Sequence, residues 1–485
     1  MAFNDLREFI TALEAKNLIK RVRLPIKQDL EVSAFADRAV KSGGPALLFE
    51  QVEGHSVPVA INLFASAERM ALALGVERLE DLAGRSGDLL RILMEPPAGG
   101  WIEKLKALPK LLDIAAILPK TVSGGPCKEV ILKGADASLD RFPIIKCWPQ
   151  DAGRYITFPL VFTKNPETGK RNCGIYRIQL FDGRTCAMHM QLHKDGRRNI
   201  ESIQKKHGGR LECGIALGPD PAVAWAGAVP APPDVDEMLF AGMVRRRGVE
   251  MVKCETVDVE VPANAEIVVE GYVDVNDWRM EGPFGDHTGY YSLPDKYPTF
   301  HVTAITHRKN PIYQTIIVGP PPMEDDWMGY AIERLFLPLL KLQLPEVVDY
   351  HMPFEGIFHN LQIVSIKKRF PGHARRVMHA IWGLPQAMFT KVIVVVDDDV
   401  NVHDPREVAW KALNHIDPER DIEFVHGPID VLDHASRLQG YGSKIGIDAT
   451  HKRPDEGFTR PWPEEMKMSA EVKMIVERKW KEAGL

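Results

Sequence analysis

The sequence predicts a protein of the α/β (α+β multidomain) class, because three kinds of pattern follow one another along the chain. Helical spacing of apolar residues dominates residues 1–120, and short strands with turns fill residues 121–320. Strands alternate with helices over residues 321–460, and residues 461–485 are expected to form a charged helical tail. A chain of 485 residues is long enough for several domains with their own cores.

The N-terminal domain, residues 1–120, is predicted to be a small mixed α/β domain. Apolar residues recur at helical spacing over 6–18 and again over 32–40, which indicates two amphipathic helices. Short apolar runs at 46–49 and 57–61 follow these helices and are expected to form strands.

The central domain, residues 121–320, is predicted to consist mainly of strands. Turn residues of the hairpin kind occur at 165–169 and 182–183, between short apolar segments. Residues 256–261 alternate strictly between polar and apolar types, as in a half-buried strand. Many short strands at this spacing predict a barrel, interrupted by one helix near residues 235–245.

The C-terminal domain, residues 321–460, is predicted to contain βαβ units and a mainly parallel sheet. The alternation is regular: helices are expected over 330–342, 372–384 and 404–416, and strands over 360–366 and 391–396. The tail helix has no obvious core to join within the chain, so it is expected to pack on a partner subunit.

Composition narrows the class of protein. A hydrophobic content of 45% and a charged content of 26% are typical of soluble globular proteins. The net charge of −5 argues against general affinity for nucleic acid or for an anionic membrane. No signal peptide and no membrane-spanning apolar run is recognised. The six cysteines form no C-x-x-C pair, which favours reduced thiols in the cytoplasm.

One predicted turn carries two carboxylates, Glu281 and Asp286, on either side of Gly282, Pro283 and Gly285. Proline and two glycines make a helix improbable here and favour a rigid turn. Two carboxylates in unequal surroundings are a common way to separate an acid from a base. An ordinary acidic surface turn explains the same residues, and the turn chemistry alone does not decide between the two.

A candidate metal set lies in the strand-rich region. Asn172 offers an amide oxygen, His193 an imidazole and Glu237 a carboxylate, and such ligands suit Mn²⁺ or Mg²⁺ bridged to a phosphate. Spacing alone does not select these three residues. On spacing alone, a hairpin with surface polar residues and a satisfied histidine is the favoured interpretation.

A rival candidate follows the apolar run at 391–396, where Asp397, Asp398 and Asp399 resemble the D-x-D site of metal-dependent glycosyltransferases. The simpler interpretation is an acidic strand end, with Asp404 capping the next helix. A third alternative is a non-enzymatic assembly protein in which the tail helix is the functional part.

The motifs together resemble the UbiD family of reversible decarboxylases. Asn172, Arg177, His193 and Glu237 precede the string Glu281-Gly-Pro-Phe-Gly-Asp-His-Thr-Gly-Tyr-Tyr291 in the order typical of that family. The string is highly specific, and the resemblance is strongest to the 3-polyprenyl-4-hydroxybenzoate carboxy-lyase branch of ubiquinone synthesis. It continues through residues 366–373, 394–401, 428–434 and 442–448.

The resemblance implies a fold and a cofactor. It implies a mixed N-terminal domain, a central split β-barrel of the flavin-reductase type and a C-terminal α/β oligomerisation domain. It also implies prenylated FMN, supplied by a partner flavin prenyltransferase, with Mn²⁺ (or Mg²⁺) and K⁺ near its phosphate. By position, the metal ligands would be Asn172, His193 and Glu237. The cofactor-binding set would be Asn172, Ile175, Tyr176, Arg177, His189, Met190, Gln191, Lys194, Asp195 and Lys391.

The implied activity is that of a carboxy-lyase that removes CO₂ from an aromatic acid, with Arg177, Glu281 and Asp286 as catalytic residues. Arg177 would keep Glu281 charged. Asp286, expected against apolar and aromatic surface, would protonate the carbon that CO₂ leaves. The implied substrate is 3-polyprenyl-4-hydroxybenzoate, with a simple hydroxybenzoate or a menaquinone-pathway naphthoate as alternatives. A cytoplasmic homo-oligomer, dimer or hexamer, is expected, and a polyprenyl substrate would require peripheral contact with the inner membrane.

Overall fold

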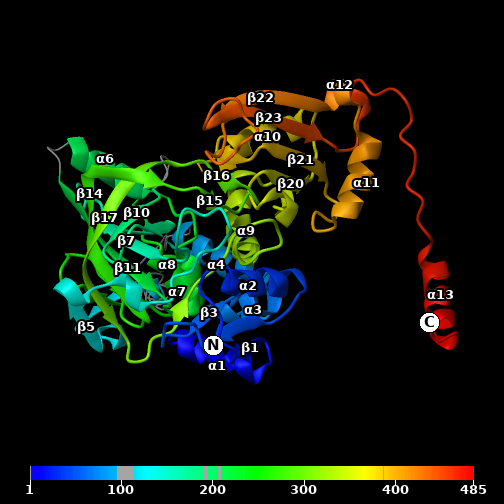
Figure 1. The fold of residues 1–485 in the computed structure, drawn as a ribbon. Coiled ribbons are helices and arrows are strands. Elements are labelled where there is room, and N and C mark those ends of the chain that lie inside the picture. Colours follow the sequence, from blue (N-terminus) through cyan, green and yellow to red (C-terminus); the bar gives the residue numbers. More distant parts are fainter. Residues whose placement is uncertain are drawn as a thin grey trace, which may run out of the picture.

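The computed structural model describes residues 2–94, 114–190, 195–205, 209–232, 234–385 and 387–484. Three sheets organise most of this chain: one in the N-terminal part, a large one in the centre and one in the C-terminal part (Figure 1). The mixed α/β multidomain class predicted from the sequence is confirmed.

The N-terminal part is a four-stranded sheet with flanking helices. Asp5 caps the first helix by accepting a hydrogen bond from the backbone N–H of Glu8, and both predicted amphipathic helices are present. The fourth strand of the sheet, β18, follows the barrel strands in sequence. The chain therefore returns to this sheet before it enters the C-terminal part. The elements are α1 (Leu6–Ala15), β1 (Ile19–Val22), α2 (Glu31–Lys41), β2 (Ala46–Phe49), β3 (Val59–Ile61), α3 (Ala67–Ala73), α4 (Asp81–Met94) and β18 (Tyr313–Gln314).

The central part is an antiparallel sheet in which eight strands form one continuous path and a ninth, β5, pairs with β17. Two long strands, β14 and β17, form its middle, and β-bulges interrupt their pairing. In order along the path, the strands are β6 (Tyr155–Ile156), β9 (Ile178–Leu180), β10 (Thr185–Met188), β17 (Asp295–His307), β14 (Ile267–Glu281), β11 (Arg210–Leu217), β7 (Leu160–Lys164) and β8 (Arg171–Ile175), with β5 (Val130–Lys133) off the path.

The connection between β8 and β9 shows that this sheet is curled. The two strands are six steps apart along the path, about 29 Å in a flat sheet at ~4.8 Å per step. Only Tyr176 and Arg177 join them, and the three Cα steps of that link span at most about 11 Å. The sheet therefore curls into an open barrel, as predicted, and Arg177 lies at the seam where its two ends approach each other.

The central part contains more helix than expected. The predicted helix near 235–245 is present as α8 (Met238–Arg245), but α6 (Asp195–Lys205) and α7 (Pro221–Ala226) also interrupt the strands, so the prediction of one helix was wrong. α7 is fully buried and apolar all round, so it has no helical periodicity to detect. Smaller elements are β4 (Lys120–Val122), β12 (Glu250–Lys253), β13 (Glu260–Pro262), β15 (Phe284–Gly285), β16 (Tyr291–Ser292) and the 3₁₀ turns η1 (Pro126–Lys128), η2 (Gly134–Asp136) and η3 (Leu139–Arg141).

The C-terminal part is a five-stranded sheet in the order β19-β20-β21-β23-β22. The inner strands β20, β21 and β23 pair in parallel and the two edge strands are antiparallel, so the predicted mainly parallel core is confirmed. The elements are α9 (Glu324–Gln343), β19 (Val347–His351), η4 (Phe354–Gly356), β20 (Leu361–Ile366), α10 (His373–Trp382), η5 (Ala387–Phe389), β21 (Val392–Asp397), α11 (Pro405–His415), α12 (Pro418–Asp421), β22 (Ile422–Pro428), β23 (Tyr441–Asp448) and η6 (Pro454–Glu456).

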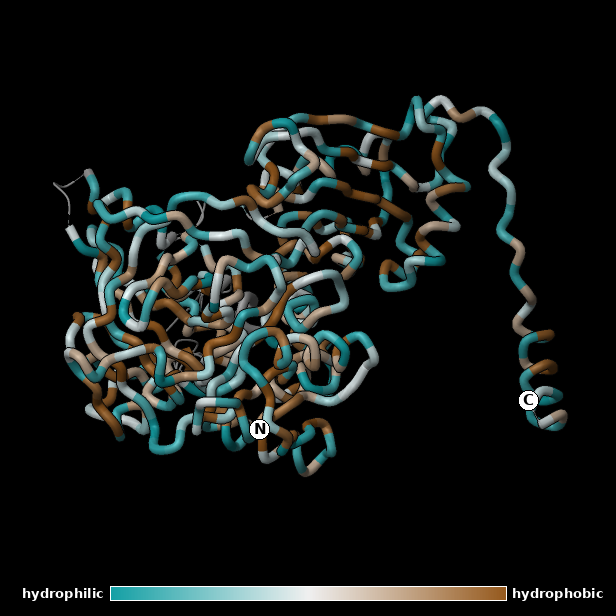
Figure 2. The backbone as a smooth tube through the Cα atoms, in the orientation of Figure 1, coloured by the Kyte–Doolittle hydropathy of each residue, from teal (hydrophilic) through white to brown (hydrophobic). Residues whose placement is uncertain are grey.

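The last helix, α13 (Ala470–Glu482), lies apart from the rest of the chain at the end of an extended segment (Figure 1). None of its residues is buried, and apolar positions alternate with polar ones along it (Figure 2). Among the described residues, no helix is long and apolar enough to cross a membrane.

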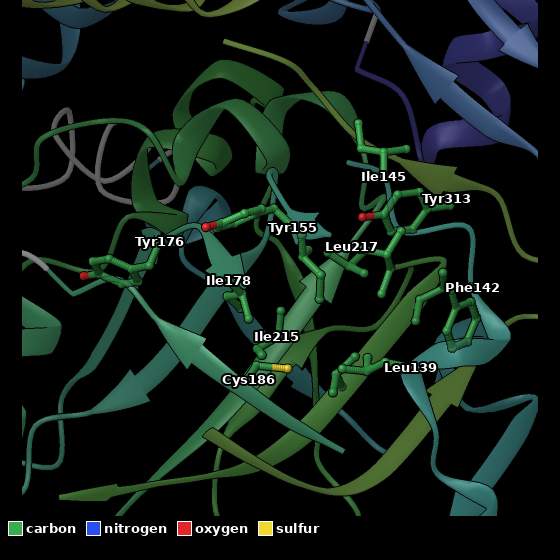
Figure 3. Close-up of a cluster of buried hydrophobic side chains, with 14 of the residues drawn as sticks. Leu139, Phe142, Ile145, Tyr155, Tyr176, Ile178, Cys186, Ile215, Leu217 and Tyr313 are labelled. Carbon is green, nitrogen blue, oxygen red and sulfur yellow. The ribbon is translucent and has the colours of Figure 1, made fainter. Parts of the chain in front are cut away.

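The largest buried cluster joins the N-terminal sheet to the barrel interior. It extends from Val32 and Phe49 to Ile178, Cys186 and Ile215 on three barrel strands. Figure 3 shows part of this cluster, with the last three side chains together inside the barrel. Because this core is continuous, the N-terminal sheet and the barrel pack against each other. This packing restricts movement of the barrel strands and of their ends.

Candidate active site

Four polar or aromatic side chains meet where barrel strands begin or end. Arg177 precedes β9, His189 follows β10, Glu281 ends β14, and Tyr297 lies near the start of β17. The antiparallel register brings these strand ends to the same edge of the sheet. The backbone N–H of His189 donates to the carbonyl of Arg177 (3.0 Å), which ties two of these positions together directly.

Arg177 and Glu281 form a buried, two-pronged ion pair. Nε of Arg177 donates to Oε1 of Glu281 (2.8 Å) and Nη2 donates to Oε2 (2.9 Å). Glu281 is fully buried, and Nδ1 of His189 lies 3.1 Å from its Oε2. Burial opposes the charged carboxylate, but the hydrogen bonds from His189 and Arg177 outweigh it and lower the pKa of Glu281 to about 2. The predicted pairing of Arg177 with Glu281 is confirmed.

Asp286 lies on the same guanidinium, which differs from the apolar surroundings expected for it. Nη1 of Arg177 donates to its Oδ2, and its Oδ1 accepts the backbone N–H of His287 (2.8 Å). Burial raises the pKa of Asp286, but the charge of Arg177 and the contacts with His287 outweigh it, so the net pKa is lowered. The turn folds both acids onto one arginine, and both are ionised in this state.

The turn between the two acids is non-helical, as predicted, and close packing fixes it. Gly282 has a φ of +89°, which favours glycine, and the Gly282–Pro283 peptide bond is cis. The N–H of Gly285 donates to Asp151 (2.8 Å). A Cβ on Gly285 would lie 2.3 Å from a ring carbon of Trp148, so only glycine fits under that indole.

Aromatic rings surround the charged groups. The Arg177 guanidinium lies 4.7 Å from the ring centre of Phe284, and the His189 ring stacks on Tyr297 at 4.1 Å. The sequence analysis did not select Tyr297, because it follows the motif on a separate strand, β17, and only the folded structure reveals its contact with His189. Tyr290, in the same motif, is 61% exposed, and its ring contacts His434 at 4.2 Å.

His189 has an open acceptor. Burial and the nearby charge of Arg177 lower its pKa, so the ring is neutral. Nδ1 faces a carboxylate and must carry the proton, which leaves Nε2 as an acceptor. Nε2 is buried without a hydrogen-bond partner among the described residues. A buried unsatisfied acceptor of this kind is typical of a position that contacts a ligand.

A polar pocket of about 250 Å³ adjoins the proposed metal set. Asn172 lines it, and the amide nitrogen of Asn172 is buried with no partner among the described residues. Glu237 lies next to β8, the strand that carries Asn172. Its Oε2 accepts a hydrogen bond from the N–H of Cys173 on that strand (2.7 Å). The sequence analysis missed most of the lining: Asn165, Glu167, Lys170, Arg171, Arg198, Asn199, Ser202, Asp234 and Val235.

The remaining predicted cofactor residues fall into three groups. Ile175 is half-buried at the end of β8, whereas the side chains of Tyr176 and Met190 lie in the hydrophobic core. Lys391 pairs with Asp433 in the C-terminal part (2.5 Å). Three predicted residues, Gln191, His193 and Lys194, lie outside the described part of the chain, and of Asp195 only the backbone, at the start of α6, is described.

Two of the three aspartates of the rival hypothesis, Asp397 and Asp399, have partners within the C-terminal part. Asp397 accepts the N–H of His451 (2.7 Å), and Asp399 lies 3.7 Å from Lys411. Asp404 caps α11 by accepting the N–H groups of Arg406 and Glu407. The capping expected in the simpler interpretation is confirmed.

A further cluster with ligand-type side chains lies in the C-terminal part. Candidate ligand atoms of Glu333, His351 and His403 lie within 4.8 Å of one another. Arg334 donates to Glu333 (2.7 Å) and to Asp349 (2.8 Å), so these acids already have a cationic partner. The cluster ties β19 to α9 and shares no residue with the predicted metal set.

Three family models match the chain, each described as a domain of 3-octaprenyl-4-hydroxybenzoate carboxy-lyase. The N-terminal domain matches residues 10–86, the Rift-related domain residues 120–321 and the C-terminal domain residues 326–449. An uncharacterized protein of Archaeoglobus fulgidus is 51% identical over 483 residues, 99% of each chain.

Solved structures similar to the chain include two decarboxylase-family proteins. The UbiD-class enzyme HmfF from Pelotomaculum thermopropionicum, in complex with FMN, is 31% identical with a TM-score of 0.79, covering 95% of this chain and 97% of that one. The vanillic acid decarboxylase of Sedimentibacter hydroxybenzoicus is 26% identical, covering 100% and 99%. Its closed form gives a TM-score of 0.85 and its open form 0.80, so this chain is more similar to the closed form.

Proposed function

The chain belongs to the UbiD family of carboxy-lyases, and from this premise we propose that it is a prenylated-FMN-dependent decarboxylase of an aromatic carboxylic acid. The observation that carries the proposal is the buried set of Arg177, Glu281 and Asp286 at the barrel seam. Three ionised side chains with so little exposure are costly to bury, and such sets concentrate at functional sites.

The residues present fit a flavin mononucleotide. A phosphate needs cationic and amide donors, and the pocket beside Asn172 provides them through Lys170, Arg171 and Asn199. The isoalloxazine needs polar contacts at the seam, where Nε2 of His189 is an unsatisfied acceptor. The HmfF structure was solved with FMN, and we propose that this chain binds the prenylated form of the same cofactor.

The cofactor, when bound, supplies an electrophilic carbon and an electron sink that side chains lack. The chain's own residues would orient the acid and handle the proton. Arg177 holds Glu281 ionised, and its guanidinium is the cationic group to which a substrate carboxylate would bind. Asp286 would donate the proton that replaces CO₂ on the carbon, so that the aryl acid is converted to the arene and CO₂.

Asn172, His193 and Glu237 would hold a divalent ion, because oxygen and imidazole ligands suit Mn²⁺ or Mg²⁺, and K⁺ is proposed nearby. The ion would supply positive charge for the cofactor phosphate. Glu237 is buried, and a buried carboxylate needs a compensating positive charge or hydrogen bonds. The hydrogen bond from the N–H of Cys173 holds this carboxylate next to the strand that carries Asn172.

The substrate proposed from the family resemblance is 3-polyprenyl-4-hydroxybenzoate, and a simple hydroxybenzoate is the second candidate. The vanillic acid decarboxylase among the similar structures acts on a small phenolic acid, which favours the second candidate. A polyprenyl substrate would also require the site to reach a membrane surface. A naphthoate of menaquinone synthesis is the third possibility.

We further propose that the protein is a homo-oligomer assembled through its tail. Apolar side chains on α13 recur at 472, 475, 476 and 480, which places them on one helix face, and all are exposed in the single chain. A helix of 13 residues is marginal alone in water, so a second copy of the chain is the expected cover for this face.

Cofactor content tests the proposed function. We expect the protein co-expressed with a flavin prenyltransferase to carry prenylated FMN at near one per chain, detected by absorbance and by mass after denaturation. Bound manganese should be measured alongside. A colourless protein without flavin mass, despite the prenyltransferase, would contradict the proposal.

A further inference from the structure

Two histidines from different parts of the chain connect Asp286 to the C-terminal part. Nδ1 of His287 lies 2.9 Å from Oδ1 of Asp286, and Nε2 of His287 lies 3.0 Å from Nε2 of His359. His359 is half-buried in the segment between η4 and β20, and its Nδ1 is covered, so the row of three groups leads from the site into the C-terminal part.

The protons on this row can be assigned from chemistry. A carboxylate only accepts, so Nδ1 of His287 carries a hydrogen that points at Asp286. Two ring nitrogens 3.0 Å apart can form a hydrogen bond only if one of them is protonated. One proton therefore lies between the two rings, and the hydrogen bonds are continuous from His359 to Asp286.

Asp286 needs a proton source because it is ionised in this state. Each decarboxylation consumes one proton at the carbon, and the carboxylate must first gain that proton. Among the described donors to Asp286, Arg177 does not release a proton and the backbone N–H does not either. His287 is the donor in that set that can pass one on.

Acidic groups around His287 favour its protonated form. Asp286 contacts it on its own loop, Asp325 faces it from α9 and Asp430 from the segment after β22. Burial lowers the pKa of His287, but these charges outweigh burial and raise it. Burial raises the pKa of Asp325 and that of Asp326, and Glu355 faces Asp326.

The segment that carries His359 is held in an unusual conformation. Ile357 and Phe358 both have positive φ, 46° and 47°, which is rare for a β-branched residue and its bulky neighbour. The Phe358 ring stacks on His287 at 5.3 Å, and a Cβ on Gly329 would lie 3.1 Å from that of Phe358. The strained backbone and the close approach to α9 fix His359 against His287.

We propose that His287 and His359 form a proton relay that recharges Asp286, completed only when the C-terminal part packs on the barrel. In each turnover the carbon takes a proton from Asp286 as CO₂ leaves. His287, with its hydrogen on Nδ1, takes a second proton on Nε2 from Nε2 of His359, and the resulting imidazolium gives its Nδ1 proton to Asp286. His359 regains a proton from the solvent, and a turn of the His287 ring restores the proton facing Asp286 before the next turnover. No electrons are exchanged. The proposal rests on the decarboxylase function proposed above.

His359→Ala tests the relay in the cofactor-loaded enzyme. We expect kcat to fall about 10- to 100-fold, less than the 10²–10⁴ of a direct general acid, because water can replace the relay slowly. Flavin content should be unchanged, and added imidazole should restore turnover by filling the space of the lost ring. His434→Ala is the matched control, since His434 contacts Tyr290 across the same interface but is not part of the row. A loss under twofold in His359→Ala, or an equal loss in His434→Ala, would overturn the relay.

A second measurement does not depend on decarboxylation. Nitrogen-15 NMR of labelled histidines in the full cofactor-free chain should show that the pKa of His287 falls in Asp286→Asn and shifts in His359→Ala. Unchanged titration of His287 in both variants would refute the relay even if the enzyme is active. Absence of turnover by the cofactor-loaded wild type would instead contradict the proposed function.

Discussion

Arg177 and Glu281 are 104 positions apart in the sequence, yet they share two hydrogen bonds of 2.8 and 2.9 Å at the seam of the barrel. The pairing is possible because Arg177 lies in the two-residue link that closes the barrel and Glu281 ends its longest strand. Charge-assisted pairs of this geometry are strong and directional. In the proposed function, the pair fixes where a substrate carboxylate would meet a cation.

Glu281→Gln should abolish decarboxylation without unfolding the protein. The amide has no charge and cannot accept both hydrogen bonds from Arg177, so we expect a loss of roughly 10³-fold or more in kcat. Arg177→Ala should give a similar loss. Glu255→Gln, the same change in a partly buried ion pair with Lys128 away from the site, is the control and should keep full activity. Turnover of Glu281→Gln near the wild-type rate would contradict its role.

The ion pair should also make stability depend on acid pH. The pKa of Glu281 is 4.5 without the fold and about 2 within it, so the folded state binds the proton more weakly. The contribution of the Glu281 charge to the free energy of unfolding is complete above about pH 4.5 and is lost as the pH falls toward 2. The difference in Tm between wild type and Glu281→Gln should therefore shrink from pH 7 to pH 3. A constant difference across this range would rule out the linkage.

Glu237→Ala should purify with little flavin and little manganese. The change removes a proposed metal ligand together with the acceptor of the Cys173 N–H. Glu237→Gln separates these effects, because the amide oxygen still accepts that hydrogen bond but carries no charge. We expect a folded Glu237→Gln protein that has lost metal, measured by elemental analysis. Full metal and flavin occupancy in both variants would place the metal elsewhere.

Glu324→Gln should stabilise the protein at alkaline pH. Burial raises the pKa of Glu324 to about 7 from 4.5, so folding becomes less favourable as the pH rises through this interval. Its Oε1 accepts the N–H of Phe64 (2.8 Å), and glutamine can keep that bond. We expect a gain of about 1–3 kcal/mol in the free energy of unfolding at pH 8 and little gain at pH 4.5, from urea titrations. An equal change in stability at both pH values would contradict the raised pKa of Glu324.

Removal of residues 461–485 should lower the oligomeric state. The exposed apolar face of α13 has no cover within the described chain, and its loss removes the proposed contact. Light scattering after size exclusion should show a smaller particle. Ile475→Asp should act in the same direction, whereas Lys481→Ala on the same helix should not. An unchanged mass after truncation would place the interface elsewhere.

Much of the site could be predicted because its chemistry is local in sequence. Glycine and proline at 282, 283 and 285 exclude a helix, so the turn and the proximity of its two acids follow from backbone rules. The C-terminal strands and helices follow from their periodicity. Barrel formation was also expected, since many short strands have few other stable arrangements.

The remaining features depend on tertiary contacts. Asp286 reaches Arg177 only because the barrel seam brings the β8–β9 link to the turn, and no local pattern reports that distance. The contact of His287 with His359 spans 72 positions and two sheets. The buried helix α7 lacks a polar face, so the periodicity that predicts surface helices is absent.

The most direct test of the central claim is CO₂ release from a panel of aryl acids by the protein co-expressed with a flavin prenyltransferase. The panel should include 4-hydroxybenzoate, its 3-prenylated analogues, vanillate and hydroxynaphthoates, with Glu281→Gln in parallel. Stoichiometric conversion of at least one acid to CO₂ and arene, absent in Glu281→Gln and without the prenyltransferase, is the predicted result. No CO₂ from any acid by protein that carries prenylated FMN would contradict the account.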